Sequence, residues 1–266
     1  GGSLGALFGS EISKRFSNSF NDFGLEFFSM SSAILLFLAM LLAIFITSKS
    51  KHSNKLELNN VGGGSFDGIK NSLKSSEIRN IAIYVWLWTG LMTIQWITAI
   101  NIVENWSQDS AQRLRFFATV EQVTSPLTLI VQLFLTNIII KKFGIKNIML
   151  MYGLLFFLAY LAYGLMPSII SVGIVTVILR IFEYGINKPT RETIFSALQK
   201  NDRYKSTVFI DTFISRFGDL TGSGFIALSK FTSIAANAVP LVALPIAGYL
   251  SFIGIKISRD NKIKDL

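Results

Sequence analysis

Two Arg–acid pairs with the same spacing carry the strongest chemical signal in this sequence. Arg180 and Glu183 lie three residues apart, and Arg216 and Asp219 repeat that spacing. In a helix, residues three apart share a face. An Arg guanidinium can hold a carboxylate or a phosphate through two parallel hydrogen bonds. The pairs therefore predict a site for an anionic group in which each acid is the charge partner of its Arg, or two structural ion pairs between helices.

Three further polar residues in apolar segments are candidate solute contacts. They are Gln95, Glu121 and Gln122. Charged and amide side chains are costly inside a bilayer and commonly mark a solute pathway. Hydrogen bonding between helices is an equally good interpretation of the glutamines.

A second charged group follows Pro189, which is expected to kink its helix. It comprises Lys188, Arg191, Glu192 and the more distant Asp211. Such a cluster at the cytoplasmic mouth of a helix bundle would suit a gate that makes and breaks salt bridges. A static network at helix ends is the alternative.

Residues needed for several other functions are missing from the sequence. The chain has no cysteine and one histidine, His52, which stands in a polar stretch. A zinc–thiolate site, an Fe–S cluster and a cysteine nucleophile are therefore excluded for this sequence. The glycine run at 62–64 lacks the Lys-Ser/Thr ending of a phosphate-binding loop. We expect no enzyme activity, no cofactor and no metal.

Composition indicates that membrane helices position these residues. The 266 residues are 51% hydrophobic and 15% charged, with a mean hydropathy of +0.50, whereas soluble domains are about 25% charged. A span needs about 20 apolar residues. The predicted spans are residues 25–47, 81–103, 116–140, 147–166, 169–197, 208–230 and 234–255, with residues 1–12 as the tail of an earlier span. At about 1.5 Å per residue, Arg180 lies roughly 16 Å deep, near the midplane.

The basic residues give these spans a direction. Most of the 25 Lys and Arg residues lie in alternate connections, around residues 49–79, 141–146, 200–205 and 256–264. Because cytoplasmic loops are enriched in Lys and Arg, these connections and the C-terminus are predicted to be cytoplasmic. The net charge of +9 is thus explained by topology and not by nucleic-acid binding. Residues 48–80 are predicted to be a flexible loop, with an amphipathic stretch at 66–73 on the membrane surface.

Several motifs resemble the major facilitator superfamily of transporters. Residues 132–136 (QLFLT) and 141–144 (KKFG) stand where that superfamily has a short basic loop. Residues 183–195 (EYGINKPTRETIF), 204–212 (YKSTVFIDT) and 216–219 (RFGD) resemble the bacterial branch related to ADP/ATP antiporters. The resemblance covers about residues 60 to 230.

The resemblance implies an all-α, twelve-span fold of two six-helix halves that move by alternating access. The expected organisation is the end of the N-terminal half at 1–47, a central cytoplasmic loop at 48–80, the C-terminal six-span bundle at 81–257 and a tail at 258–266. The rest of the N-terminal half would precede this chain. The predicted function is secondary transport of a small anionic solute, with nucleotides among the candidates, across the bacterial inner membrane. A coupling ion or counter-substrate would take part. A receptor or scaffold on the same fold is the alternative.

Overall fold

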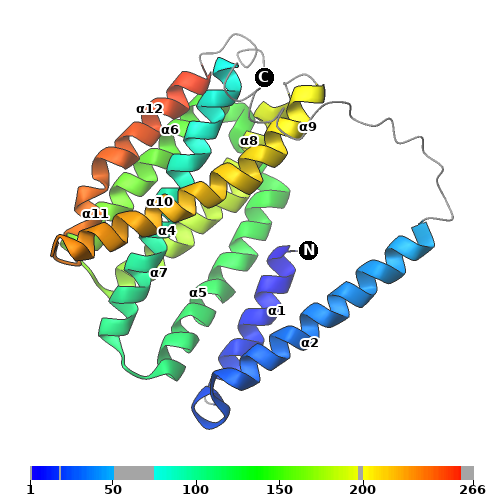
Figure 1. Cartoon of the computed structure of the whole chain (residues 1–266), viewed down its shortest axis with the longest axis vertical. Helices are drawn as coiled ribbons and strands as arrows, with labels where there is room; N and C mark the ends of the chain where they lie inside the picture. The colour runs from blue at the N-terminus through cyan, green and yellow to red at the C-terminus, as the bar shows by residue number, and fades with distance from the viewer. Residues whose placement is uncertain (1, 18, 51–74, 197–199, 259–266) are drawn as a thin grey trace.

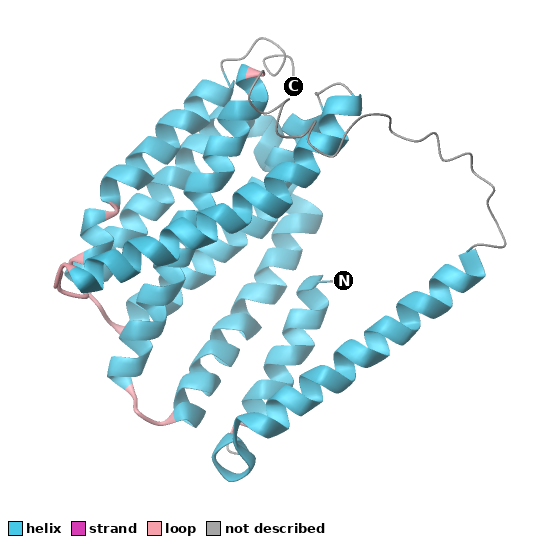
Figure 2. Cartoon of the chain, viewed as in Figure 1, coloured by secondary structure: helices cyan, strands magenta, loops and turns pink. Residues whose placement is uncertain are grey.

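The computed structural model describes residues 2–17, 19–50, 75–196 and 200–258, and within them the ordered elements are all helical. Figure 1 labels the helices and Figure 2 shows the short loops between them. The elements are α1 (Gly2–Arg15), α2 (Ser19–Ser50), α4 (Ser76–Trp106), α5 (Ser110–Ile130), η1 (Val131–Leu135), α6 (Thr136–Leu165), α7 (Ile169–Phe182), η2 (Glu183–Asn187), α8 (Lys188–Ser196), α9 (Lys200–Phe209), η3 (Ile210–Ile214), α10 (Ser215–Phe231), α11 (Val239–Val242) and α12 (Leu244–Ser258). The all-α prediction is confirmed for these residues.

Five helical stretches in the described part of the chain are long and apolar enough to cross a membrane. They are Ser29–Lys49, Ile78–Trp106, Ser110–Leu165, Ile169–Ser196 and Val239–Ile257. This indicates a protein embedded in a membrane.

The sequence predicts seven spans, and two features of the structure explain why the described residues give five. The longest stretch contains Gly144, whose φ of 72° and ψ of 159° are not helical. Two helices meet at this kink, which falls between the predicted third and fourth spans. The single stretch Ser110–Leu165 therefore contains both predicted spans. The predicted sixth span is helical through α9, η3 and α10 but is not among the five. Its charged residues, including Arg216 and Asp219, make it less apolar than the others.

Tight packing at small residues fixes α10 against α4. A Cβ on Gly222 would lie 2.5 Å from the carbonyl oxygen of Gly90, and a Cβ on Gly218 would collide with the side chain of Thr89. Because only glycine allows these approaches, the helices can come together closely, as is common in membranes. Elsewhere α12 lies along α6 at one edge of the bundle (Figure 1).

The N-terminal helices lie at the opposite edge. Helix α1 packs against α5, while α2 diverges from the bundle, with its apolar side chains exposed along residues 30–46 (Figure 1). Two predictions fall outside the described residues: the surface stretch at 66–73, with most of the 48–80 loop, and the cytoplasmic tail beyond residue 258.

Three π-helical segments interrupt the long helices in the described ranges, and hydrogen bonds join two of them. The Gln132 amide in η1 donates a hydrogen bond to the Tyr184 carbonyl in η2 at 3.0 Å. The Thr136 hydroxyl donates to the Gly185 carbonyl at 2.5 Å. A Cβ on Gly185 would lie 2.7 Å from a methyl group of Val131. Side chains from α5–α6 thus satisfy carbonyls that the π turn frees, and π segments of this kind occur frequently at functional sites.

Candidate functional site

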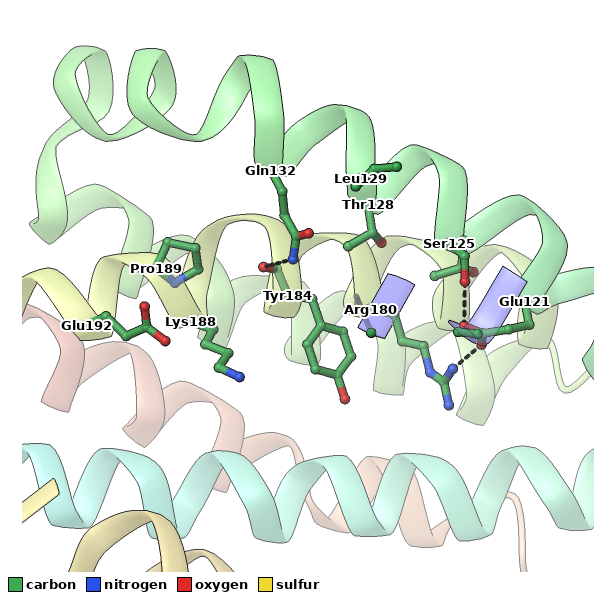
Figure 3. A pocket seen from close by; sticks show the side chains of 13 residues that line it. Glu121, Ser125, Thr128, Leu129, Gln132, Arg180, Tyr184, Lys188, Pro189 and Glu192 are labelled. Carbon is green, nitrogen blue, oxygen red and sulfur yellow. Dashed lines mark hydrogen bonds and ion pairs between the residues drawn. The ribbon is translucent and has the colours of Figure 1, made fainter. Parts of the chain in front are cut away.

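A cavity of about 760 Å³ lies between α5 and the continuous α7–η2–α8 helix, with residues of α1 at its side. Its size falls within the range of small-molecule sites. The polar residues that line it come in two rows, one on each wall (Figure 3). It brings together Arg180 and Glu121 from the predicted solute contacts with Lys188 and Glu192 from the predicted gate.

Arg180 is held by groups from two neighbouring helices, α5 and α4. Its guanidinium forms an ion pair with Glu121 of α5, and it lies 5.5 Å above the ring of Trp96 of α4. The Ser125 hydroxyl donates to the other oxygen of Glu121 at 2.8 Å. The Arg180 and Glu121 side chains are 31% and 23% exposed. A guanidinium has five donors, so the described ion pair leaves several for a group in the cavity.

The wall formed by α7, η2 and α8 carries a stripe of polar residues at intervals of four. Arg180, Tyr184, Lys188 and Glu192 all line the cavity. Figure 3 shows the Tyr184 ring between the two cationic side chains. Within the described part of the chain, the Lys188 ammonium has no salt bridge or hydrogen bond. The stripe therefore offers two cations on either side of an aromatic ring.

The opposite wall, on α5 and η1, carries a matching stripe, of which the sequence analysis predicted Glu121 as a solute contact. Glu121, Ser125, Thr128 and Gln132 follow one helix face and line the cavity. Thr128 is 3% exposed, and its hydroxyl has no hydrogen-bond partner among the described residues. The signal was present in the sequence, because spacings of four, three and four residues follow helical periodicity.

Glu183 does not pair with Arg180, which corrects the predicted charge partnership. Residues three apart differ by about 60° around a helix axis. Here that difference directs Arg180 toward α5 and Glu183 into the core, where Glu183 is 2% exposed. Its carboxylate accepts a hydrogen bond from the Asn187 amide at 2.8 Å, and Asn187 in turn accepts one from the Tyr84 hydroxyl at 3.0 Å. Glu183 is thus part of a buried polar network that joins α4 to η2.

The predicted gate residues separate into two groups. Arg191 forms an ion pair with Asp211 at 3.5 Å, and its guanidinium lies 4.9 Å above the ring of Trp88. The Arg191 side chain is 7% exposed and that of Asp211 45%, so a buried cation is paired with a half-exposed acid. Lys188 and Glu192 line the cavity instead.

The second Arg–acid pair lies away from the cavity. Arg216 pairs with Asp219 at 3.1 Å on the surface of α10, and the Thr93 hydroxyl donates to Asp219 at 3.0 Å. The Arg216 side chain is 81% exposed. The structure therefore places neither residue beside Arg180 or Glu121.

The two glutamines have contacts within the bundle. Gln95 is buried, and its amide donates to the Tyr163 hydroxyl at 2.9 Å and to the Thr176 hydroxyl at 3.5 Å. Gln122 accepts a hydrogen bond from Lys14 of α1 at 2.8 Å and donates one to Glu11. Both glutamines connect helices, as in the alternative interpretation, and neither lines the cavity.

The described residues contain no group of three or more His, Cys, Asp or Glu side chains suited to a metal ion. The chemistry of the cavity is that of ion pairs and hydrogen bonds. It can bind a charged or polar solute and hold it beside an aromatic ring.

Comparison with known proteins gives no match, either to a family model or to a curated protein.

Proposed function

We propose that this chain forms part of a secondary transporter that moves a small anionic solute through a membrane by alternating access. The observation that carries the proposal is Arg180, a half-buried guanidinium that lines a polar cavity between helices long and apolar enough to cross a bilayer. Ionisable groups in such helices usually serve a solute or ion pathway. The resemblance to major facilitator transporters, and to their nucleotide-exchanging relatives, supports the same proposal.

The lining of the cavity also supports binding of a polar solute. Arg180 has donors beyond its ion pair with Glu121, Lys188 supplies a second cation, and Thr128 supplies a buried hydroxyl without a partner. Buried donors are almost always satisfied in native structures. A solute or water in the cavity would satisfy the hydroxyl of Thr128.

In the proposed transport cycle, the helices move at the π segments and the Arg191–Asp211 ion pair opens and closes. The α7 helix passes through η2 between the Arg180 end of the cavity and Arg191, and α9 passes through η3 at Asp211. In the proposed cycle the Arg191–Asp211 contact forms the cytoplasmic gate and breaks when the site opens inward. Its 3.5 Å separation is longer than a normal hydrogen bond, so charge attraction and not a hydrogen bond holds the pair.

Flux measurements test the proposal. The full-length protein is reconstituted in liposomes, and uptake and counterflow of labelled dicarboxylates, sugar phosphates and nucleotides are measured. At least one anion class is expected to move, and the Arg180→Ala variant is expected to abolish that movement. Binding of anions with no flux under any gradient would favour a receptor. Unchanged flux in Arg180→Ala would overturn the assignment of the cavity as the site.

A further inference from the structure

The carboxylate of Glu121 beside Arg180 could bind a positively charged group of a solute, in addition to the anionic group that Arg180 would bind. Arg180 and Glu121 present a cation and a carboxylate side by side on facing walls of one cavity. A site for simple anions has no need of a carboxylate. The carboxylate would compete with the anionic solute for the guanidinium and would repel the solute. Glu121 is nevertheless kept in the lining, with one oxygen bonded to Ser125 and the other to Arg180.

Glu121 keeps capacity to accept more hydrogen bonds. An ionised carboxylate has about four lone-pair sites, and the structure fills two of them. The group whose charge and donors match the remaining capacity is an ammonium. Arg180 and Glu121 together therefore match a carboxylate and an ammonium carried on neighbouring atoms, which is the headgroup of an α-amino acid.

The other end of the cavity adds a separate cation. Lys188 lies two helical turns from Arg180, about 12 Å along the axis, and Figure 3 shows the Tyr184 ring between them. An anionic group at the far end of a solute would meet Lys188 while its aliphatic middle packs on Tyr184. Arg180 and Lys188 supply two positive charges for the two carboxylates of such a solute, and Glu121 supplies the negative charge for its ammonium. Glu192, the other acid of the lining, lies at the Lys188 end (Figure 3), so the four ionisable residues sum to zero.

We propose that the solute of this cavity is an anionic amino acid, with its headgroup held between Arg180 and Glu121 and its distal carboxylate at Lys188. This rests on the proposed transport of an anionic solute and narrows its chemical class. Glu121 acts as the selectivity residue, because it attracts the ammonium and disfavours dicarboxylates that lack one.

Matched probes that differ only in the amino group test the proposal. Competition binding on the full-length protein compares glutamate with glutarate, 2-aminoadipate with adipate, and 2-aminopimelate with pimelate. Each amino diacid is expected to bind at least about tenfold more tightly than its partner, the value of one hydrogen bond between charged groups. In the Glu121→Gln variant this preference is expected to disappear, with the simple diacids binding as well as before or better.

Control variants separate the possible outcomes. Glu104→Gln makes the same change on an exposed carboxylate of α4 that does not line the cavity, and it should keep the full preference for amino diacids. Lys188→Gln should weaken diacid and amino diacid alike. Equal binding of each matched pair by the unmodified protein would overturn the amino-acid inference and leave anion transport standing. Absence of binding for every anion would instead overturn the proposed function, and a preference that survives Glu121→Gln would exclude Glu121 as its cause.

Discussion

The two Arg–acid pairs have equal spacing in the sequence and opposite surroundings in the structure. Arg180 crosses from α7 to an acid on α5 and lies on an aromatic ring, so three helices determine its position. Among the described residues Arg216 pairs with Asp219, one turn away on its own helix, and its side chain is 81% exposed. An identical local pattern thus gives an interhelical contact in one region and a surface pair in the other.

The difference comes from the packing of α10. Gly218 and Gly222 place one face of α10 directly against α4, and this contact fixes which residues remain outside. Arg216 and Asp219 lie at the border of that outer face, where Thr93 of α4 reaches Asp219. Their assignment as solute contacts stays a prediction, since the described cavity does not include them.

Replacement of the two arginines should show the largest contrast. Arg180→Ala is expected to weaken binding of the solute by about 10- to 100-fold, the range for hydrogen bonds to a charged group. Arg216→Ala is expected to change it less than about threefold. Isothermal titration or competition binding on purified protein measures both. An equal loss in the two variants would show that the pairs serve one site and would remove the contrast.

The packing that separates the pairs can be tested at two glycines of α10. Gly222→Val should destabilise the protein by about 1–3 kcal/mol, because the side chain collides with the backbone of α4. Gly224→Val is the matched control, since a Cβ there meets nothing within 4 Å, and the expected change is within about 0.5 kcal/mol. Thermal unfolding in detergent compares them. If both variants unfold alike, the α4–α10 contact is not what orients Arg216.

A smaller effect is expected at Gln95, where a substitution tests whether a buried polar side chain stabilises the helix bundle or binds the solute. Gln95→Leu removes the contacts to Tyr163 and Thr176 and should cost about 0.6–1.7 kcal/mol, the range for hydrogen bonds between membrane helices. Solute affinity should not change. A large loss of affinity without loss of thermal stability would return Gln95 to the set of solute contacts.

The smallest effect is expected at the exposed pair itself. Asp219→Asn should change the free energy of unfolding by less than about 0.5 kcal/mol, because exposed ion pairs contribute little. Unfolding at low and high salt gives the measurement. A cost well above 1 kcal/mol would mean that Asp219 is buried in the functional assembly, and the contrast with Glu121 would narrow.

Part of the candidate site could be predicted from the sequence and part could not. Arg180, Glu121, Lys188 and Glu192 stand out as charges in apolar helices, and all four line the cavity. Ser125, Thr128 and Tyr184 were not predicted, because neutral polar residues are common in membrane helices. Their position in the cavity lining becomes visible only when the two walls are seen together. The Arg180–Glu183 partnership was wrong because it considered one helix, whereas the partner of Arg180 stands on another.

The sequence by itself determined the class of structure and the energetic cost of placing charged side chains inside the bilayer. Hydrophobic runs of about 20 residues require helices in a bilayer, and any Arg within them must find a partner or water. The tertiary structure decided which partner. Helical periodicity fixes only the angle of a side chain around its own axis, whereas contact depends on the neighbouring helix and its distance. Small residues such as Gly222 and the interlocked π segments at Gln132 and Tyr184 set that neighbourhood, and for this reason Arg180 faces a cavity and Arg216 does not.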